Sequence, residues 1–480
     1  MKKLLLTAIE TANTKKATYA DARVVNEKNE LIRVKNSEIL EPTMSESSGI
    51  GIRVIVDGAW GFASTSDLSV KSITKTAVTA IEIAKASAKL KKENIELSKE
   101  EVFTDKWQTP YKTDPFDVPM EQKVNTLVKV NEILKKAKQI SVAESSMSFT
   151  REHKYFASSE GAFIEQIIVY SGCGYSATAI SNGDAQIRSY PMSFGGEYES
   201  AGYELIDRLQ LLQNAEKTRD EAVALLTAKT CPSGKMDLIL LPSQMVLQIH
   251  ESVGHPTELD RVFGTEESYA GKSFVTTEKY RNFKYGSEIV NLVADNQIET
   301  GLATAGYDDD GVPAQKWHIV KNGQFVGYQT NREFAPRIGD AHSTGNNRAD
   351  GFNKIPIIRI ANLYLMPGTG KLKELIAGVK HGIIMDNTRS WSIDQLRYNF
   401  QFGCEIGWEI NDGKITGIVK NPTYQGITPE FWSSCDATCG QDEWKLLGVA
   451  NCGKGQPGQV ARMSHGAAPT RFRNVTIGVR

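Results

Sequence analysis

Residues 231–256 read CPSGKMDLILLPSQMVLQIHESVGHP, and the division of the chain is clearest in this stretch. The turn cluster Cys231-Pro232-Ser233-Gly234 separates a long charged segment from an apolar run. That run, Met236 to Leu241, is short and bounded by turn residues, which is typical of a buried strand. Pro242 and Ser243 then suit the first positions of a helix. The sequence therefore predicts that a new domain opens here with a strand followed by a helix.

The predicted helix after Pro242 carries a histidine and a glutamate beside its apolar side. The apolar positions recur at helical spacing and predict a buried stripe: Met245, Val246, Ile249 and Val253. Residues 250–255, HESVGH, form an H-E-x-x-x-H pattern, one residue longer than the H-E-x-x-H in which two histidines share a helix face. At about 100° per residue, an i, i+5 pair in a regular α-helix diverges by roughly 140° and cannot grip one ion. A π-type turn would bring both imidazoles to one side, so we expect a distorted helix in which Gly254 permits the strain and Pro256 ends the regular structure.

A third ligand would turn this pattern into a metal site. Catalytic zinc takes three protein ligands, leaves one position for water, and accepts thiolate as readily as imidazole. Cys452 lies in residues 451–456, NCGKGQ, which predict a Gly-flanked loop where a thiolate can approach an ion, with Lys454 favouring the ionised sulfur. Each cysteine can equally be a small buried apolar residue. Spacing alone does not rank Cys452 above three others: Cys404, Cys435 and Cys439.

Three other features have weaker interpretations. His465 follows Cys452 closely enough to enter the same pocket, where it would hydrogen-bond a developing oxyanion, although a packed or exposed histidine is the competing interpretation. Cys435 and Cys439 resemble half of a structural zinc site, but no second pair accompanies them, and we predict two free thiols. The stretch Asp308-Asp309-Asp310-Gly311 lacks the alternation and closing glutamate of a calcium loop, so it predicts an acidic turn.

Composition limits the classes of protein. With 480 residues the chain is expected to form two or three domains. Its formal net charge is -1 and it has no long Lys/Arg run, which argues against nucleic acid as a partner. The apolar stretch near the start is ended by Glu10, short of a secretion signal, and no run approaches the ~20 apolar residues of a membrane span. We expect a cytoplasmic protein whose cysteines are free thiols or ligands, because 6 Cys in 480 residues are too few for a disulfide scaffold.

The fold predicted from patterning is α+β, in two halves. Residues 1–230 should form an α+β domain with long helices on antiparallel sheets, built from two related subunits at about 1–104 and 115–230. Helices are predicted at 69–90, 120–138 and 203–230, and Asp57-Gly58 predicts a hairpin turn. Residues 231–480 should be β-rich, with turn pairs such as Asn322-Gly323 and Asp412-Gly413, and should carry one distorted metal-binding helix.

Several stretches resemble the TldD branch of the TldD/PmbA peptidase family, whose members were once called modulators of DNA gyrase. They occur in order along the carboxy-terminal half: Ile249 to His255, Ser343 to Asn346, Ile355 to Gly368, Gly413 to Val419, Cys452-Gly453-Lys454 and Asn474 to Gly478. The resemblance implies that His250, His255 and Cys452 bind zinc and that Glu251 is catalytic. PmbA-like (TldE) paralogues lack the motif, so its presence implies the catalytic branch.

The resemblance also implies a function. It points to a zinc peptidase that acts on unfolded or short peptides. The protein is expected to be a homodimer or a heterodimer with a PmbA/TldE-like paralogue, and the peptides are expected to enter a chamber between the subunits. Because an extended peptide can pair its backbone with a sheet edge, we expect little sequence preference. The alternative is a non-catalytic, zinc-braced scaffold of the gyrase-modulator type. Glu251 is needless in a structural zinc site, and the near-zero net charge offers DNA no footprint, so the peptidase interpretation is favoured.

Overall fold

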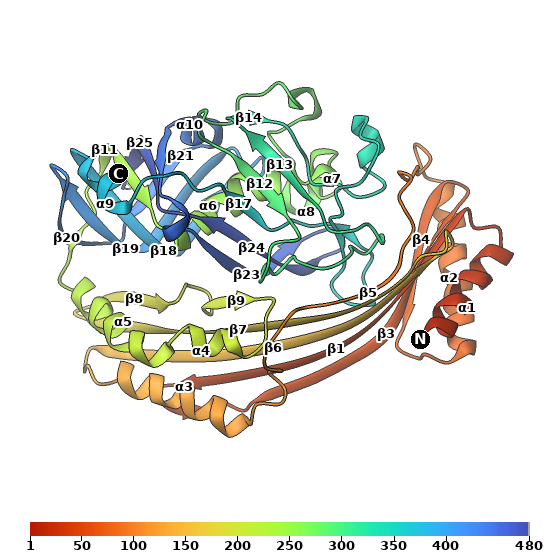
Figure 1. The fold of residues 1–480 in the computed structure, drawn as a ribbon, viewed down its shortest axis with the longest axis horizontal. Coiled ribbons are helices and arrows are strands. Elements are labelled where there is room, and N and C mark those ends of the chain that lie inside the picture. The colour runs from red at the N-terminus through yellow and green to blue at the C-terminus, as the bar shows by residue number, and fades with distance from the viewer. Residues whose placement is uncertain (479–480) are drawn as a thin grey trace.

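A long curved sheet forms the amino-terminal half and lies beneath the carboxy-terminal half (Figure 1). The structure is a computed structural model that describes residues 1–478. The strand order is β4-β3-β1-β6-β7-β5, with β2 paired to β1 and both β8 and β9 paired to β7. The strands are β1 (Tyr19–Lys35), β2 (Glu38–Ile39), β3 (Thr43–Val56), β4 (Ala59–Thr65), β5 (Thr104–Gln108), β6 (Ile140–Ser158), β7 (Phe163–Ser181), β8 (Asp184–Tyr190) and β9 (Glu197–Glu199).

Helices cover the two ends of this sheet. At one end lie α1 (Lys2–Thr14) and α2 (Val70–Ala88), and at the other lie α3 (Met120–Leu134) and α5 (Leu211–Leu225) (Figure 1). The single helix predicted at 203–230 is wrong, because α4 (Glu204–Arg208) and α5 are separate. Gln210 between them has a left-handed φ of 48°, which interrupts a right-handed helix.

One sheet unites the strands of both predicted amino-terminal subunits, since β1 pairs with β6 over 15 residues, from Asp21 to Lys35. The boundaries predicted for these two subunits and for the domain after them, at residues 104, 115 and 230, stay predictions. Of the second predicted domain, residues 479 and 480 lie outside the described residues.

The three dipeptides that predicted turns do join neighbouring strands. Asp57-Gly58 connects β3 to β4. In the carboxy-terminal half, Asn322-Gly323 joins the strands Lys316–Lys321 and Gln324–Phe325, and Asp412-Gly413 joins the strands Asn399–Asn411 and Lys414–Lys420. In each pair both residues have positive φ, 51° and 72° at Asp57 and Gly58. Asn, Asp and Gly tolerate that conformation, and its twist matches the twist of paired strands. These turns were therefore predictable from local sequence.

The carboxy-terminal half is β-rich, as predicted, and the α+β class is confirmed. Its larger sheet has the order β10-β20-β19-β18-β11-β25-β21, with β22 on β25, and its smaller sheet has the order β14-β13-β12-β17-β24-β23. The first comprises β10 (Lys229–Thr230), β11 (Gly234–Leu240), β18 (His381–Ile393), β19 (Asn399–Asn411), β20 (Lys414–Lys420), β21 (Thr423–Ile427), β22 (Cys435–Thr438) and β25 (Thr470–Ile477). The second comprises β12 (Leu292–Asp295), β13 (Lys316–Lys321), β14 (Gln324–Phe325), β17 (Leu363–Leu365), β23 (Lys445–Lys454) and β24 (Gln459–Ala467).

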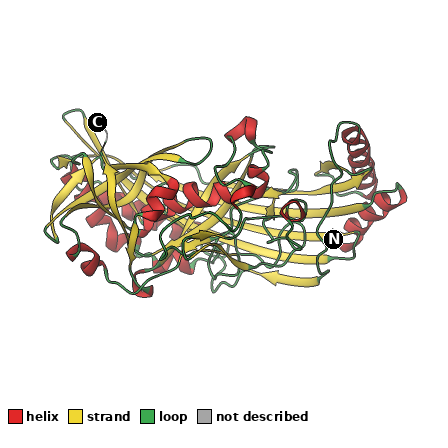
Figure 2. Ribbon diagram, turned by 90° about the horizontal axis from the view of Figure 1, so that it is seen from above, coloured by secondary structure: helices red, strands yellow, loops and turns green. Residues whose placement is uncertain are grey.

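The remaining elements of this half are short. Two strands form a separate ladder, β15 (Asn347–Arg348) and β16 (Ile357–Ile358). The helices are α6 (Pro242–Ile249), α7 (Leu259–Val262), α8 (Glu267–Ala270), α9 (Leu372–Ala377) and α10 (Thr428–Ser433). Seen from above, helices lie over the middle of the molecule, while the far end of the curved sheet extends away (Figure 2).

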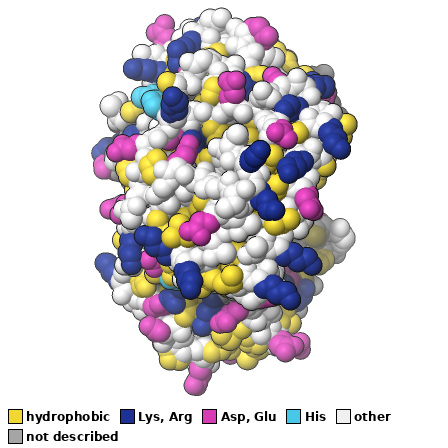
Figure 3. Space-filling view, turned by 90° about the vertical axis from the view of Figure 1, so that its right-hand side faces the viewer, with side chains coloured by type: hydrophobic (Ala, Val, Ile, Leu, Met, Phe, Trp, Pro, Cys, Tyr) yellow, Lys and Arg dark blue, Asp and Glu magenta, His cyan; other side chains and the backbone are white. Residues whose placement is uncertain are grey.

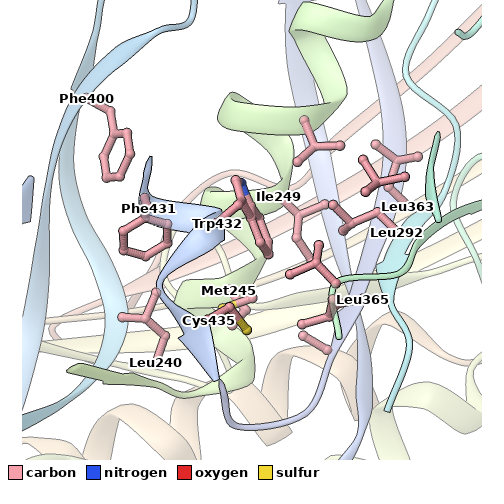
Figure 4. Packing of buried hydrophobic residues seen from close by; sticks show 14 of the residues in the cluster. Leu240, Met245, Ile249, Leu292, Leu363, Leu365, Phe400, Phe431, Trp432 and Cys435 are labelled. Carbon is pink, nitrogen blue, oxygen red and sulfur yellow. The ribbon is translucent and has the colours of Figure 1, made fainter. Parts of the chain in front are cut away.

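Helix α6 is embedded in the largest apolar core. Met245 and Ile249 on this helix point toward Trp432 and toward leucines of β12 and β17 (Figure 4). Both side chains are fully buried. Burying a side chain of this size contributes about 1.5–3 kcal/mol. The core therefore fixes the apolar side of α6, and the fixed helix in turn positions the histidine-bearing turn that follows it.

The acidic turn at 308–310 joins the two halves. Asp309 pairs with Arg23 of β1 at 2.9 Å and with Lys154 of β6 at 2.7 Å, and Asp310 pairs with Arg53 of β3 at 2.5 Å. All three aspartates of the turn are buried. The predicted acidic turn is present, but it is a docking point between the halves.

The length of the helices and the distribution of surface charge bear on membrane and nucleic-acid contacts. Within the described residues, no helix is long and apolar enough to cross a membrane. On the face shown in Figure 3, basic and acidic side chains are interspersed.

Candidate metal centre

A π turn follows α6 directly and brings the two motif histidines together. Residues His250–Gly254 form this turn, and the His255 backbone N–H donates to the His250 carbonyl oxygen. This i→i+5 hydrogen bond is the wider turn that the H-E-x-x-x-H spacing requires. The two imidazole centroids lie 4.8 Å apart with an interplanar angle of 84°. The predicted helix distortion is present.

Gly254 supports the turn for a different reason from the one predicted. Its backbone is right-handed, with φ -58° and ψ -68°, so it stores no left-handed strain. A Cβ at this position would lie 2.9 Å from Ile360 Cδ1 and 3.1 Å from Ile360 Cγ2. Glycine is therefore needed because Ile360 packs closely against the turn. Pro256 lies in a 3₁₀ turn, His255–Thr257, that ends the helical segment.

Cys452 completes the group. Its Sγ lies 3.4 Å from His255 Nε2, and potential ligand atoms of His250, His255 and Cys452 all lie within 4.8 Å of one another. Cys452 belongs to strand β23, where the pairing with β24 shifts register between Val449 and Cys452. The predicted loop is thus a bulged strand. The bulge re-aims the side chain of a β-strand residue, as bulges beside functional sites do.

Each histidine is oriented by a buried partner on its other ring nitrogen. His255 Nδ1 lies 2.8 Å from Glu258 Oε2, and His250 Nδ1 lies 2.8 Å from His465 Nε2. Both arrangements leave Nε2 available to a metal, and such partners typically fix the ring orientation of metal-binding histidines. Two imidazoles and one thiolate are a donor set that suits zinc. The residues present therefore fit a zinc ion.

The charge state of the thiol is set by neighbours other than the predicted one. Burial would raise the pKa of Cys452, but His255 and Arg359 lower it below its usual value. Burial would lower the pKa of His255, but the charges of Cys452 and Glu258 raise it. Lys454 is buried and pairs with Asp260 at 2.7 Å and with Glu258 at 3.2 Å. Lys454 therefore neutralises the carboxylate that holds His255, and Arg359 and His255 favour the thiolate.

Glu251 lies in the cavity beside these residues. Arg397 Nη1 donates to Glu251 Oε2 at 2.7 Å. Burial would raise the pKa of Glu251, but Arg397 and the two histidines hold it below the usual value. The carboxylate is therefore ionised at neutral pH and able to accept a proton. The cavity has a volume of about 350 Å³, and its walls include Glu251, the three clustered residues and a loop of the amino-terminal half.

The other candidates lie elsewhere. His465 on β24 is fully buried behind His250 and is not among the residues that line the cavity, so its position makes it a partner of His250. Cys435 and Cys439 are buried free thiols, and burial raises the pKa of Cys439 to about 12. Within residues 1–478, His250, His255 and Cys452 are the one group of three or more His, Cys, Asp or Glu side chains that lie close enough together to share a metal ion.

Four residues of the centre were not identified from the sequence. Glu258 had a usable signal, because it follows His255 by three residues and i, i+3 side chains meet on helical turns. The others are contributed by distant segments and carried no local signal: Arg359, Arg397 and Phe194.

Comparisons with known proteins agree along nearly the whole chain. Residues 20–84, 113–226 and 233–479 match models described as domain 1, the central domain and the C-terminal domain of PmbA/TldA metallopeptidases. A metalloprotease of Methanocaldococcus jannaschii is 32% identical over 443 residues, which cover 91% of this chain and 92% of that protein. A zinc metalloprotease TldD homolog of Saccharolobus solfataricus is 24% identical and covers 98% of each chain.

Solved structures share the fold. A protein of Thermotoga maritima described as a candidate modulator of a DNA gyrase superposes with a TM-score of 0.78 at 16% identity, covering 99% of this chain and 100% of the other. TldE of Thermococcus kodakarensis superposes with a TM-score of 0.72, also at 16% identity and with full coverage of both chains. At these identities the likeness concerns the fold alone.

Proposed function

The chain belongs to the PmbA/TldD metallopeptidase family, and on that basis we propose that it is a zinc-dependent peptidase of the TldD, catalytic branch. In this proposal His250, His255 and Cys452 hold the zinc ion and Glu251 is the general base. The observation that carries it is the π turn, which brings both histidines to Cys452 while leaving Glu251 in the adjoining cavity. The substrates are unfolded or short peptides.

The zinc ion, when bound, would lower the pKa of a water molecule toward ~7 and polarise a carbonyl group. Glu251 would accept a proton from water in the cavity and pass it to the leaving amine. Arg397 holds Oε2 of Glu251 and leaves Oε1 for that proton. Glu258 and His465 keep the two imidazoles oriented. In this role His465 supports the site from behind and does not contact the substrate.

The alternative is a scaffold braced by zinc. A structural zinc site is closed by four protein ligands, whereas three such side chains cluster here and a cavity opens beside them. An ionised carboxylate in that cavity serves a peptidase and adds nothing to a brace. These observations favour the enzyme.

Assembly is a further part of the proposal. We infer a homodimer or a heterodimer with a PmbA/TldE-like paralogue, cytoplasmic in location, with no nucleic-acid partner. Light scattering of the purified chain, alone and mixed with such a paralogue, would measure this. A monomer that is fully active at high dilution would refute it.

The function is tested by Glu251→Gln. Glutamine keeps the size and hydrogen bonding of glutamate but cannot take a proton, so zinc content and melting temperature should persist. Turnover of an unfolded peptide should fall by at least about 10²-fold, the usual minimum for a lost general base. Near-normal turnover would exclude Glu251 as the base, and lost zinc would show that it supports the metal. If the wild-type protein, loaded with zinc and supplied with its partner, cleaves no peptide, the peptidase proposal is refuted and the scaffold interpretation replaces it.

A further inference from the structure

Two large apolar side chains stand half-exposed in the wall of the cavity that contains Glu251. Phe194 is 57% exposed and Trp391 is 50% exposed. Their rings lie 5.4 Å apart at 84°, the edge-to-face arrangement that aromatic pairs prefer. An exposed apolar pair in the wall of a cavity is informative, because contiguous exposed apolar surface is a mark of interaction sites, ligand-binding grooves among them.

Phe194 is held in place by a tightly packed loop. Its φ of 61° is left-handed, an unfavourable conformation for a residue with a Cβ that persists where the surroundings impose it. Gly196, two residues on, has no room for a side chain, since a Cβ there would lie 2.1 Å from the Cys173 carbonyl oxygen and 2.4 Å from Gly174 Cα. The loop is therefore pressed against strand β7. Phe194 lines the cavity because close packing of the neighbouring residues fixes the backbone of the loop.

The same loop is fastened to the strand that carries Cys452. Glu197 Oε1 accepts from the Gly448 backbone N–H at 2.8 Å. A Cβ on Gly448 would lie 2.1 Å from the Tyr198 carbonyl oxygen, so β9 and β23 touch here. On the Trp391 side, Asn387 of β18 donates to the Ser189 carbonyl oxygen of β8 at 3.0 Å. Both rings are thus positioned by contacts between the two halves of the chain.

The rest of the cavity suits an apolar group. Apart from His250, His255 and Cys452, the charged residues that line the cavity are Glu251 and Arg397, and these two pair with each other at 2.7 Å. Neither of these two residues therefore offers an uncompensated charge to a charged side chain of a substrate. Met192, Val246 and Leu247 are further apolar residues in the wall of the same cavity. The volume of about 350 Å³ is near the lower end for ligand sites and fits a short segment of peptide.

We propose that Phe194 and Trp391, with Met192, Val246 and Leu247, form a subsite for a bulky apolar side chain of the peptide close to the scissile bond. This proposal rests on the proposed peptidase function. The subsite adds a preference at one position of the peptide to the expectation of little sequence preference. At the other positions the peptide backbone can still pair with a sheet edge without selecting side chains.

The test uses peptides that are identical except at one position, which is Phe, Leu, Ala or Asp. Zinc-loaded wild-type protein digests each peptide, mass spectrometry locates the cleaved bond, and initial rates give kcat/KM. When the varied residue neighbours the cleaved bond, we expect Phe and Leu to exceed Ala by about tenfold or more, the scale of discrimination in an apolar pocket. Asp should be the poorest substrate.

A double variant, Phe194→Asn with Trp391→Ala, then removes both rings. Asparagine tolerates the left-handed backbone, so the loop should keep its conformation. The preference for Phe over Ala should fall to within about threefold because kcat/KM for the Phe peptide decreases, while zinc content and melting temperature are retained. Ile415→Ala on β20, which is 49% exposed outside the cavity, is the control and should leave the preference unchanged.

The outcomes separate the two proposals. Equal cleavage of all four peptides by wild type would overturn the subsite and leave the peptidase intact, whereas no cleavage of any peptide would overturn both. A preference that survives in the double variant would also overturn the subsite. If that variant keeps the preference but changes the molecular mass in solution, the aromatic pair is an interface between copies of the chain.

Discussion

At the scale of single residues, the distinction between Cys452 and the other cysteines is sharp. All six cysteines are buried, yet the Cys452 thiol lies against two histidines and has a lowered pKa, while burial raises that of Cys435. We predict about one zinc per chain and loss of most of it in Cys452→Ser, because a hydroxyl is a poor substitute for a thiolate. Elemental analysis after dialysis measures this. Cys435→Ser is the matched control, and stoichiometric zinc in Cys452→Ser would mean that another residue is the ligand.

Glu258 offers a second test at this scale. Its carboxylate is fully buried, and burial would raise its pKa, but Lys454 and His255 hold it well below the usual value. Removing such a partner of a ligating histidine typically weakens metal binding by about 10–100-fold. We predict that weakening for Glu258→Gln, measured by competition with a chelator. Glu266→Gln, a buried carboxylate paired with Arg261, controls for general destabilisation and should retain affinity.

At the scale of elements, the π turn depends on close packing between segments. Gly254→Ala would place a Cβ 2.9 Å from Ile360, and overpacking of this kind typically destabilises by about 1–3 kcal/mol. We predict a lower melting temperature and weaker zinc binding. Adding Ile360→Val removes the nearer contact and should recover part of both losses. Gly417→Ala on β20, where a Cβ meets nothing within 4 Å, should be nearly neutral. No recovery in the double variant would argue against the contact.

At the scale of the whole molecule, buried ion pairs fasten the curved sheet to the carboxy-terminal half. Arg23 and Asp309 are each about 3% exposed in their side chains. Removing one partner of a buried pair typically destabilises by about 3–5 kcal/mol. Arg23→Met should therefore lower the melting temperature by about 5 °C. The control is Lys35→Met on the same strand, whose pair with Glu144 is half-exposed and of little energetic weight.

The same pair predicts a dependence on pH. Burial would raise the pKa of Asp309, but Arg23 and Lys154 lower it to about 2. A carboxyl whose pKa is lower in the folded state stabilises the fold above its unfolded pKa of about 4, and that contribution disappears as pH falls through the folded value. The difference in melting temperature between wild type and Arg23→Met should thus shrink between about pH 4 and pH 2. A constant difference over that range would show that Arg23 acts through packing and not through charge.

Local sequence determined the features that depend on neighbours along the chain. The turn dipeptides specified hairpins because few residue pairs accept positive φ at both positions, and the apolar stripe of α6 specified its buried side. The spacing of His250 and His255 required a π turn, since no regular helix places an i, i+5 pair on one face. Even these predictions had errors where a single backbone angle mattered, as at Gln210, which splits the helix expected at 203–230.

Tertiary structure decided what depends on distant contacts. The sequence could not rank Cys452 by spacing, because its approach to His255 follows from sheet pairing between β23 and β24 and from a bulge in that pairing. It gave no sign that Arg397 would hold Glu251, or that a loop at Phe194 would reach the cavity from the other half of the chain. For His465 the sequence allowed both a position in the pocket and a packed position, and the structure shows the ring fully buried with Nε2 2.8 Å from His250 Nδ1. The physical reason is common to all of these: a side chain's chemistry is set by the neighbours that folding brings to it.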